Sequence, residues 1–262
     1  MNSNIIYKYF KIDEYFYRSI ANNYLWFSDP TNFNDPYDFN LSTAKDFDEN
    51  DLRNYFSRIQ SQGNSALLEN QIERRIEEFK NNADKFKSEL LEFERSIVNQ
   101  KYGVCCFSEF SELMLMWSHY GDKHQGICLG FDRTKDKNFF ENSLYVTYPP
   151  EYPSFNFVKD RFTKAPGDTV KFHMGTKSRD WEYEKEIRII HEKEIDDVYR
   201  GAVKFKKEAL VEVIFGYKTV PTKIEELKKL FKQCGYSADF KQAKLKEYEF
   251  GLDIRLIGEC RE

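Results

Sequence analysis

The sequence predicts an α+β fold, in which helices cover a mixed and mostly antiparallel sheet and a helical hairpin is inserted into the chain. Two observations predict it. Short apolar runs typical of strands outnumber helices at the spacing that parallel βαβ units require. The heavily charged residues 47–100 instead carry apolar side chains at three- and four-residue spacing, which is typical of amphipathic helices. We therefore expect a single domain over residues 1–262, with a helical insertion at about 47–100.

A strand, a helix and a second strand are expected at the start of the chain. Asp13 precedes the first helical residues, where an aspartate accepts hydrogen bonds from the unpaired amides of the first turn. The segment TNFNDPYD then combines Asn, Asp and Pro, which predicts an ordered loop. The expected ranges are a strand at 5–9, a helix at about 13–23 and a strand at 24–28.

The rest of the chain outside the insertion is predicted mainly as strands. Two unbroken apolar runs, YGVCCFSE and GICLGFD, flank a short helix and are typical of buried strands. Gly235 follows a helical stretch, at the position where glycine commonly ends a helix. We expect strands at 102–109, 126–132, 143–148, within 179–190, and at 202–205, 211–216, 240–248 and 252–257, with helices at 113–120 and 222–234.

Composition limits the function classes. No run of about 18 apolar residues occurs, and the first residues lack the pattern of a signal peptide, so we expect a cytoplasmic protein without membrane contact. The five cysteines form no CxxC pair, which favours reduced, mostly buried thiols over a disulfide frame or a structural metal site. Residues 204–247 carry eleven Lys against six acids, a pattern that a solvated helix surface explains more readily than binding to nucleic acid or to an acidic partner.

The segment KSRDWEYEKEIR is the strongest candidate for chemistry. If it is a strand, alternation places Glu182, Glu184, Glu186 and Arg188 on one face. Carboxylates so close together raise one another's pKa unless cations neutralise them, and proteins tolerate this at a solvated edge or at a working site. Trp181 beside the acids favours a lined pocket. The alternative is an exposed strand whose acids pair with Arg188 and nearby lysines.

The segment WSHYGDKHQG carries two histidines around a turn. His119 and His124 are five residues apart and cannot share a helix face, but a turn can bring their rings together. Two histidines and a glutamate from the acidic segment would form a metal-ligand set. The alternative is that His124 hydrogen-bonds a turn while Trp117 and Tyr120 belong to the core.

The loop FNDPYD offers two further polar residues. Asn34 and Asp35 either close an Asx turn before Pro36, or orient a ligand at the rim of a cleft. The second interpretation requires the WSHYGDKHQG and WEYEKEIR segments to meet in space, with this loop beside them.

These motifs, taken together, resemble a known family. The order YKY, LWFSDPTNFNDPYD, CFSE, MWSHYGDKHQGICLGFD, KSRDWEYEKEIRII and VEVIFGYKT is similar to the bacterial domain-of-unknown-function family 2971, over nearly the whole chain. Phe10 stands where that family often has arginine after YKY, and the segment 47–100 is variable in it. Neither difference changes the core pattern.

A second resemblance is to ADP-ribosyltransferases, and it implies an ADP-ribosyltransferase-like arrangement of the sheets. These enzymes have a polar residue on an early strand, a central hydroxyl or aromatic motif, and a late strand that begins with a catalytic glutamate, often in E-x-E. The usual His or Arg of the first motif is missing, unless Lys8 substitutes for it. The positions matched in order are Tyr7, Lys8 and Tyr9, then Ser118 and Tyr120, then Glu184 and Glu186.

The resemblance implies an enzyme that takes NAD as substrate and cleaves the nicotinamide–ribose bond, passing ADP-ribose to a protein, a nucleic acid or water. Glu186 would stabilise the oxocarbenium-like transition state and Glu184 would orient the acceptor. Tyr9, Trp117 or Trp181 would stack on nicotinamide. Small bacterial enzymes of this kind are often toxins or anti-phage effectors.

Two other functions remain open. One is a metal-dependent nuclease or hydrolase, in which Asp35, His119, His124 and Glu186 hold a divalent ion. The other is a non-catalytic ligand sensor whose 47–100 helices contact a protein partner. The candidate ligand-binding residues are Tyr7, Lys8, Tyr9, Asn34, Asp35, Trp117, Ser118, His119, Tyr120, His124, Trp181 and Arg188.

Overall fold

The computed structural model divides the chain into two compact units, which we describe separately. The sheet unit comprises Met1–Asp29, Tyr102–Val146 and Asp180–Glu262, and the helical unit comprises Pro30–Lys101 and Thr147–Arg179. The residues that the structure describes are 4–30, 33–39, 41, 47–61, 69–89, 92, 102–153, 155–156, 158–160, 166–192 and 201–259.

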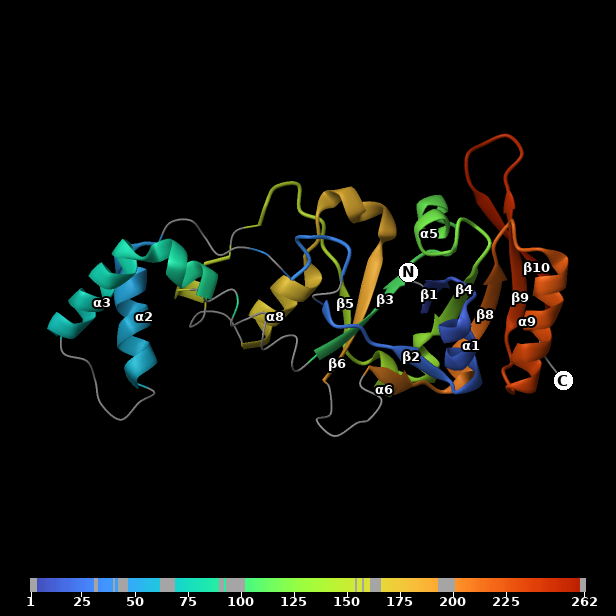
Figure 1. Ribbon diagram of the computed structural model, residues 1–262, viewed down its shortest axis with the longest axis horizontal. Coiled ribbons are helices and arrows are strands. Elements are labelled where there is room, and N and C mark those ends of the chain that lie inside the picture. Colours follow the sequence, from blue (N-terminus) through green and yellow to red (C-terminus); the bar gives the residue numbers. More distant parts are fainter. Residues whose placement is uncertain are drawn as a thin grey trace. The chain divides into compact units, whose positions relative to one another are not determined.

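An eight-stranded sheet organises the sheet unit (Figure 1). The strand order is β10-β9-β8-β4-β1-β3-β6-β5, and neighbours pair antiparallel except for the parallel pair β8–β9. The α+β prediction of a mixed, mostly antiparallel sheet is therefore confirmed. The strands are β1 (Ile5–Phe10), β3 (Tyr102–Ser108), β4 (Ile127–Asp132), β5 (Ser143–Tyr145), β6 (Glu186–Glu192), β8 (Leu210–Phe215), β9 (Asp239–Leu245) and β10 (Leu252–Glu259), and β2 (Tyr24–Trp26) pairs separately with β7 (Ala202–Lys204).

Two helices cover one face of the sheet, which we call the apolar face. Helix α1 (Glu14–Ala21) begins at Asp13, whose Oδ1 accepts from the amide of Phe16 at 3.1 Å, so the predicted cap is confirmed. Helix α9 (Pro221–Gln233) ends before Gly235, which has a φ of 74° that favours glycine. Both helices pack on a cluster of Phe, Ile and Leu from six strands of the sheet. Short helical segments lie at Arg133–Lys135, Lys137–Phe140 (α6) and Lys207–Ala209.

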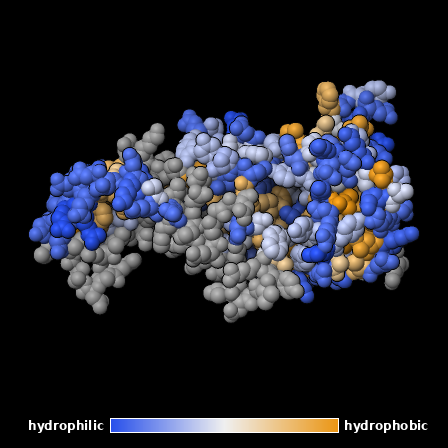
Figure 2. Space-filling model, in the orientation of Figure 1, coloured by the Kyte–Doolittle hydropathy of each residue, from blue (hydrophilic) through white to orange (hydrophobic). Residues whose placement is uncertain are grey.

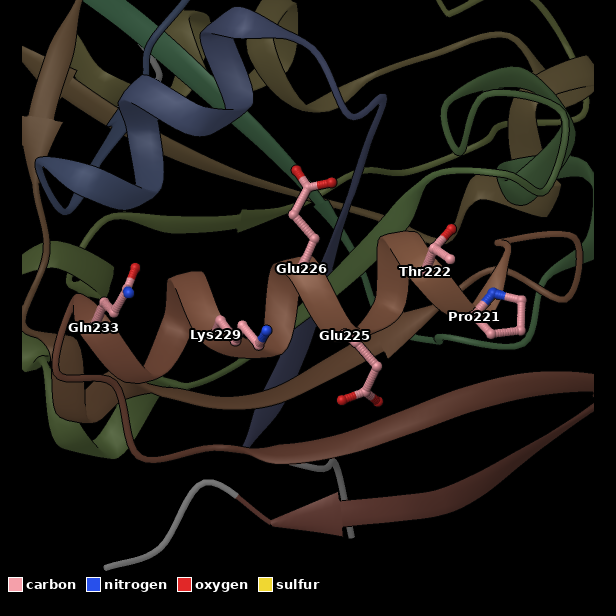
Figure 3. A pocket seen from close by; sticks show the side chains of 6 residues that line it. All are labelled: Pro221, Thr222, Glu225, Glu226, Lys229 and Gln233. Carbon is pink, nitrogen blue, oxygen red and sulfur yellow. The ribbon is translucent and has the colours of Figure 1, made fainter.

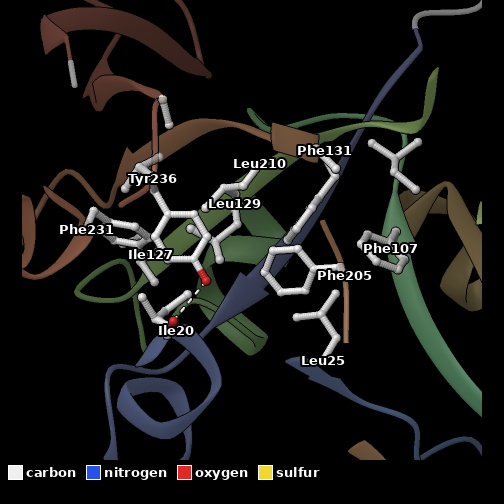
Figure 4. Packing of buried hydrophobic residues seen from close by; sticks show 14 of the residues in the cluster. Ile20, Leu25, Phe107, Ile127, Leu129, Phe131, Phe205, Leu210, Phe231 and Tyr236 are labelled. Atoms are coloured by element: carbon white, nitrogen blue, oxygen red, sulfur yellow. Dashed lines mark hydrogen bonds between the residues drawn. The ribbon is translucent and has the colours of Figure 1, made fainter. Parts of the chain in front are cut away.

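Figure 4 shows part of the cluster on the apolar face. Phe131, Phe205 and Phe231 are buried among aliphatic side chains. Tyr236 is also buried, and its hydroxyl donates to the carbonyl oxygen of Ile20 at 2.8 Å. A buried hydroxyl needs such a partner, because an unpaired one would lose its hydrogen bonds to water. This cluster therefore ties α1, α9 and the sheet together.

Helix α5 (Met114–His119) covers the opposite face, which we call the polar face. Strand alternation turns Tyr7 and Tyr9 of β1 to this side, while Ile6 faces the apolar cluster. Met116 and Trp117 of α5 pack on these tyrosines. The predicted helix at 113–120 is thus found, and it lies on the polar face.

The helical unit contains the described part of the predicted insertion. Helices α2 (Glu49–Ser61) and α3 (Glu69–Asn81) form a pair, residues 83–89 are also helical, and α8 (Pro166–Gly175) lies further along the chain. Leu52, Ile76 and Phe79 are buried between them at the spacing that predicted the helices. The surface that α2 and α3 show in Figure 2 is almost wholly hydrophilic. Contacts between residues place α2 and α3 in the same unit as residues 147–179. The sequence pattern did not predict this grouping.

One predicted element is wrong in part. Residues Arg179–Glu184 form a 3₁₀ helix, and β6 begins only at Glu186. Lys185 between them has a φ of 46°, which breaks the extended backbone. Alternation therefore applies to Glu186 and Arg188, and it does not place Glu182 or Glu184 on that face. Within the described residues, none of the helices has the length and apolar character to cross a membrane.

Candidate functional site

A hydrogen bond joins the two longest motifs on the polar face. The hydroxyl of Tyr120, at the end of α5, donates to Oε1 of Glu184 at 2.7 Å. The hydroxyl of Ser108, at the end of β3, donates to the backbone oxygen of Glu184 at 2.6 Å. Glu184 is 3% exposed. The structure thus brings WSHYGDKHQG and WEYEKEIR together around this buried carboxylate.

Glu186 and Arg188 form a buried ion pair beside that contact. Nε of Arg188 donates to Oε1 of Glu186 at 2.8 Å, and Nη2 donates to Oε2 at 3.1 Å. Glu186 is 4% exposed and Arg188 is fully buried. Because isolated charges are costly to bury, each of the two depends on the other for compensation. Alternation on β6, which predicted a shared face for these two, accounts for the geometry.

Burial affects three cysteine thiols of the sheet, one of which lies beside this pair. Cys106 lies opposite Arg188 in the β3–β6 register. Burial, and secondarily the charge of Glu186, raises the pKa of the Cys106 thiol well above its usual range. Burial likewise raises the pKa of Cys105 and of Cys128. The described cysteines 105, 106, 128 and 234 are free, as the sequence predicts.

Three aromatic rings near Glu184 retain solvent-exposed surface, and we call them the aromatic platform. The ring centroid of Tyr183 lies 6.2 Å from that of Trp181 and 6.1 Å from that of His119, each at 37° between planes. Trp181 and Tyr183 are half-buried and His119 is exposed. Sequence reasoning missed Tyr183, because strand alternation placed it on the face away from Glu184.

Other predicted aromatic residues are core residues. Trp117 is fully buried, its indole nitrogen donates to the carbonyl oxygen of Ser111 at 2.8 Å, and the ring of Tyr9 meets it edge-on at 5.2 Å. The hydroxyl of Tyr9 donates to the carbonyl oxygen of Phe110 at 2.8 Å. Neither ring has a surface on which a ligand could stack in this structure, and the core interpretation of Trp117 is the one that fits.

The remaining residues of the first strand differ in their surroundings. Tyr7 is half-buried on the polar face, and burial followed by the charge of Glu212 raises the pKa of its hydroxyl. Lys8 points its Nζ to the carbonyl oxygen of Cys106 at 2.9 Å, and the same nitrogen lies 5.5 Å from the ring centroid of Phe107. Phe107 belongs to the apolar cluster, so Lys8 is bound away from the aromatic platform.

The two histidines of WSHYGDKHQG have different neighbours. His119 lies beside Tyr183, whereas His124 lies 3.0 Å from the hydroxyl oxygen of Ser118 through Nε2 and 5.1 Å from the ring centroid of Tyr217. Burial and the charge of Lys218 lower the pKa of His124. Across the described ranges, no group of three or more His, Cys, Asp or Glu side chains is arranged to hold a metal ion.

Asn34 and Asp35 lie in the helical unit. Oδ1 of Asp35 accepts from the amide of Tyr37 at 2.9 Å, which is the Asx turn that the sequence offered as one alternative. In the same loop Asp38 pairs with Lys177 at 3.8 Å, and both side chains are buried. The predicted position of Asn34 and Asp35 at the rim of the cleft stays a prediction.

An open depression lies elsewhere, along α9 (Figure 3). All of its lining side chains come from this one helix, so they follow a single surface and do not converge on a common point. None of the predicted site residues lines it, and the polar face remains the candidate site. The lining residues are Pro221, Thr222, Glu225, Glu226, Lys229 and Gln233.

Comparison with known proteins gives one match, to a family model. No curated protein and no solved structure matches the chain. The resemblance to ADP-ribosyltransferases therefore gains no support from these comparisons. Residues 116–189, which run from α5 to the middle of β6, match the model of the family described as Protein of unknown function (DUF2971), so the resemblance to that family is confirmed over this part of the chain.

Proposed function

We propose that the sheet unit binds NAD at the aromatic platform and cleaves the bond between nicotinamide and ribose, transferring ADP-ribose to a macromolecule or to water. The observation that carries this proposal is the hydrogen bond from Tyr120 to Glu184. This bond fixes the side chain of Glu184, the first acid of the E-x-E motif, and Glu186 begins β6 two residues later. The half-exposed ring of Tyr183 directly precedes Glu184 in the same 3₁₀ helix.

The chemistry assigns a role to each group. Departure of nicotinamide leaves positive charge on the ribose, and a fixed carboxylate stabilises that charge. Glu186 is held in one orientation by its two contacts with Arg188. A carboxylate has about four acceptor positions, and two of them accept from Arg188. The platform of His119, Trp181 and Tyr183 offers planar surface to nicotinamide or adenine.

The burial of the same carboxylates favours a second candidate, a non-catalytic ligand sensor. Glu184, Glu186 and Arg188 are almost inaccessible to solvent, and each carboxylate already has a partner. A ligand that meets only the exposed rings would be bound without being converted. The part of the chain that the structure describes has no metal-ligand cluster, so no observation favours the nuclease alternative.

Release of nicotinamide tests the two candidates. The purified protein is incubated with NAD, nicotinamide is quantified by chromatography, and NAD binding is followed by titration calorimetry. Glu186→Gln should lower the rate about a hundredfold or more, because it removes the charge and keeps the shape. Glu182→Gln is the matched control, since Glu182 is half-exposed and accepts from Lys185 at 3.3 Å.

Each outcome has a distinct meaning. Nicotinamide release that is lost in a Glu186→Gln variant shown by thermal melting to be folded, and kept in Glu182→Gln, supports the enzyme. Binding without release supports the sensor. Neither binding nor release, with a folded protein, overturns both.

A further inference from the structure

We infer that Ser118 and His124 form a second reactive site, separate from the aromatic platform, in which His124 activates the Ser118 hydroxyl toward activated acyl esters. The inference goes beyond the proposed function and does not depend on it. The distance between Oγ of Ser118 and Nε2 of His124 is 3.0 Å, which is the contact that a nucleophile and its base require. Both side chains are partly exposed.

The Ser118 hydroxyl has two acceptors for its single proton. One is the carbonyl oxygen of Met114, one turn earlier in α5, at 3.0 Å, and the other is the imidazole of His124. Rotation about the Cβ–Oγ bond moves the proton from the first to the second. In the second orientation a neutral imidazole removes the proton as Oγ attacks.

The backbone around His124 is held in a costly conformation. Asp122, Lys123 and His124 have successive φ values of 47°, 53° and 69°, a region that residues other than glycine seldom adopt. Such strain persists only where the surroundings enforce it, and it is concentrated at functional sites. The amide of His124 donates to the carbonyl oxygen of Trp117 at 3.1 Å. A side chain at Gly216 would collide with the carbonyl oxygen of His124, so only glycine admits this close approach.

The surroundings suit a base. Burial, and secondarily the charge of Lys218, lowers the pKa of His124, which favours a neutral imidazole near pH 7. Nδ1 of His124 is buried, and no group of the described residues hydrogen-bonds to it. A serine triad places a carboxylate at that nitrogen, so the pair here is a dyad, and we expect slow turnover.

The reaction balances without any further reagent. Oγ of Ser118 bonds to the carbonyl carbon of the ester, and its proton passes to Nε2 of His124. The ester's alcohol then leaves and takes that proton, which forms an acyl-serine. Water, deprotonated by His124, adds to the acyl carbon and releases a carboxylic acid and free Ser118.

A serine-directed fluorophosphonate probe, with peptide mass spectrometry, tests the site in the full chain. We expect one label, on Ser118, and a labelling rate that falls as His124 is protonated in acid. Ser118→Ala should abolish the label, and alanine is well tolerated in a helix. His124→Asn should lower the rate about a hundredfold, the usual scale of general-base catalysis, and asparagine tolerates a positive φ.

Ser143→Ala is the matched control, because Ser143 is partly buried and donates to the carbonyl oxygen of Phe140, not to a histidine. Its labelling should equal that of the wild type. The inference is overturned if the wild type takes no label, if Ser118→Ala keeps the label, or if folded His124→Asn reacts at the wild-type rate. Thermal melting of each variant establishes that it is folded.

Discussion

The two faces of the eight-stranded sheet are built from different chemistry. The apolar face buries phenylalanine and aliphatic residues under α1 and α9. Burial of these side chains away from water stabilises the fold. The polar face buries Glu184, Glu186 and Arg188; Glu184 accepts from the half-buried Tyr120, and Glu186 pairs with Arg188. Buried ion pairs are often no more stabilising than apolar residues of the same volume. The apolar face accounts for the stability of the fold, and the proposed function assigns the chemistry to the polar face.

The largest expected effect lies on the apolar face. Phe131→Ala should lower the free energy of unfolding by about 3 to 5 kcal/mol, because the ring is fully buried among other rings and its loss leaves a cavity. Urea denaturation followed by circular dichroism measures it. A loss below about 1 kcal/mol would mean that this face is less closely packed than described.

A similar or slightly smaller loss is expected when the ion pair on the polar face is broken. Arg188→Met should cost about 3 kcal/mol, because Glu186 would remain buried without the compensating charge of Arg188. The double variant Arg188→Met with Glu186→Gln should regain much of that loss. If the double variant is no more stable than the single one, the pair contributes more than mutual compensation, and the contrast between the faces weakens.

Tyr120→Phe should have a smaller effect. It removes one hydrogen bond to a buried carboxylate, and such bonds contribute about 1.5 to 3 kcal/mol. The unfolding free energy should fall by that amount, and the proposed nicotinamide release should fall with it. Tyr24→Phe, on the half-buried β2, is a control that should change neither. Unchanged stability in Tyr120→Phe would mean that the contact with Glu184 is dispensable.

The smallest effect concerns pH. The pKa of His124 is lowered in the folded protein, so below about 6.5, its usual value, the unfolded state binds more protons and stability is lost as the pH falls. The unfolding free energies of the wild type and of His124→Asn, compared at pH 7.5 and at pH 5.5, should show a steeper fall in the wild type. Equal falls would show that His124 titrates normally.

Most of the fold could be predicted from the sequence, because it follows from apolar periodicity. The runs at β3, β4 and β8, the cap at Asp13 and the stop at Gly235 all depend on neighbouring residues. The positive φ of Lys185 could not be predicted in this way, since nothing in the local pattern forbids a continuous strand from Trp181. Because the extended backbone is broken at Lys185, Tyr183 and Glu184 lie on a 3₁₀ helix and not on the predicted strand.

The candidate site was predicted less completely for a related reason. Glu186 and Arg188 follow from alternation, and the meeting of the two long motifs follows from their polar and aromatic content. The burial of Trp117 against Tyr9 depends on tertiary packing of α5, which sequence spacing does not specify. The pairing of His124 with Ser118 depends on positive φ values at Asp122, Lys123 and His124. None of these residues is glycine, so the sequence does not predict this backbone conformation.

Hydrogen exchange with and without NAD tests most directly whether the polar face is the binding site. The account predicts slower amide exchange at residues 117–120 and 181–188 when NAD is added, and no change along α9, where the open depression lies. The same experiment with Glu182→Gln should give the wild-type pattern. Protection confined to Pro221–Gln233, or no protection anywhere at saturating NAD, would contradict the assignment of the polar face.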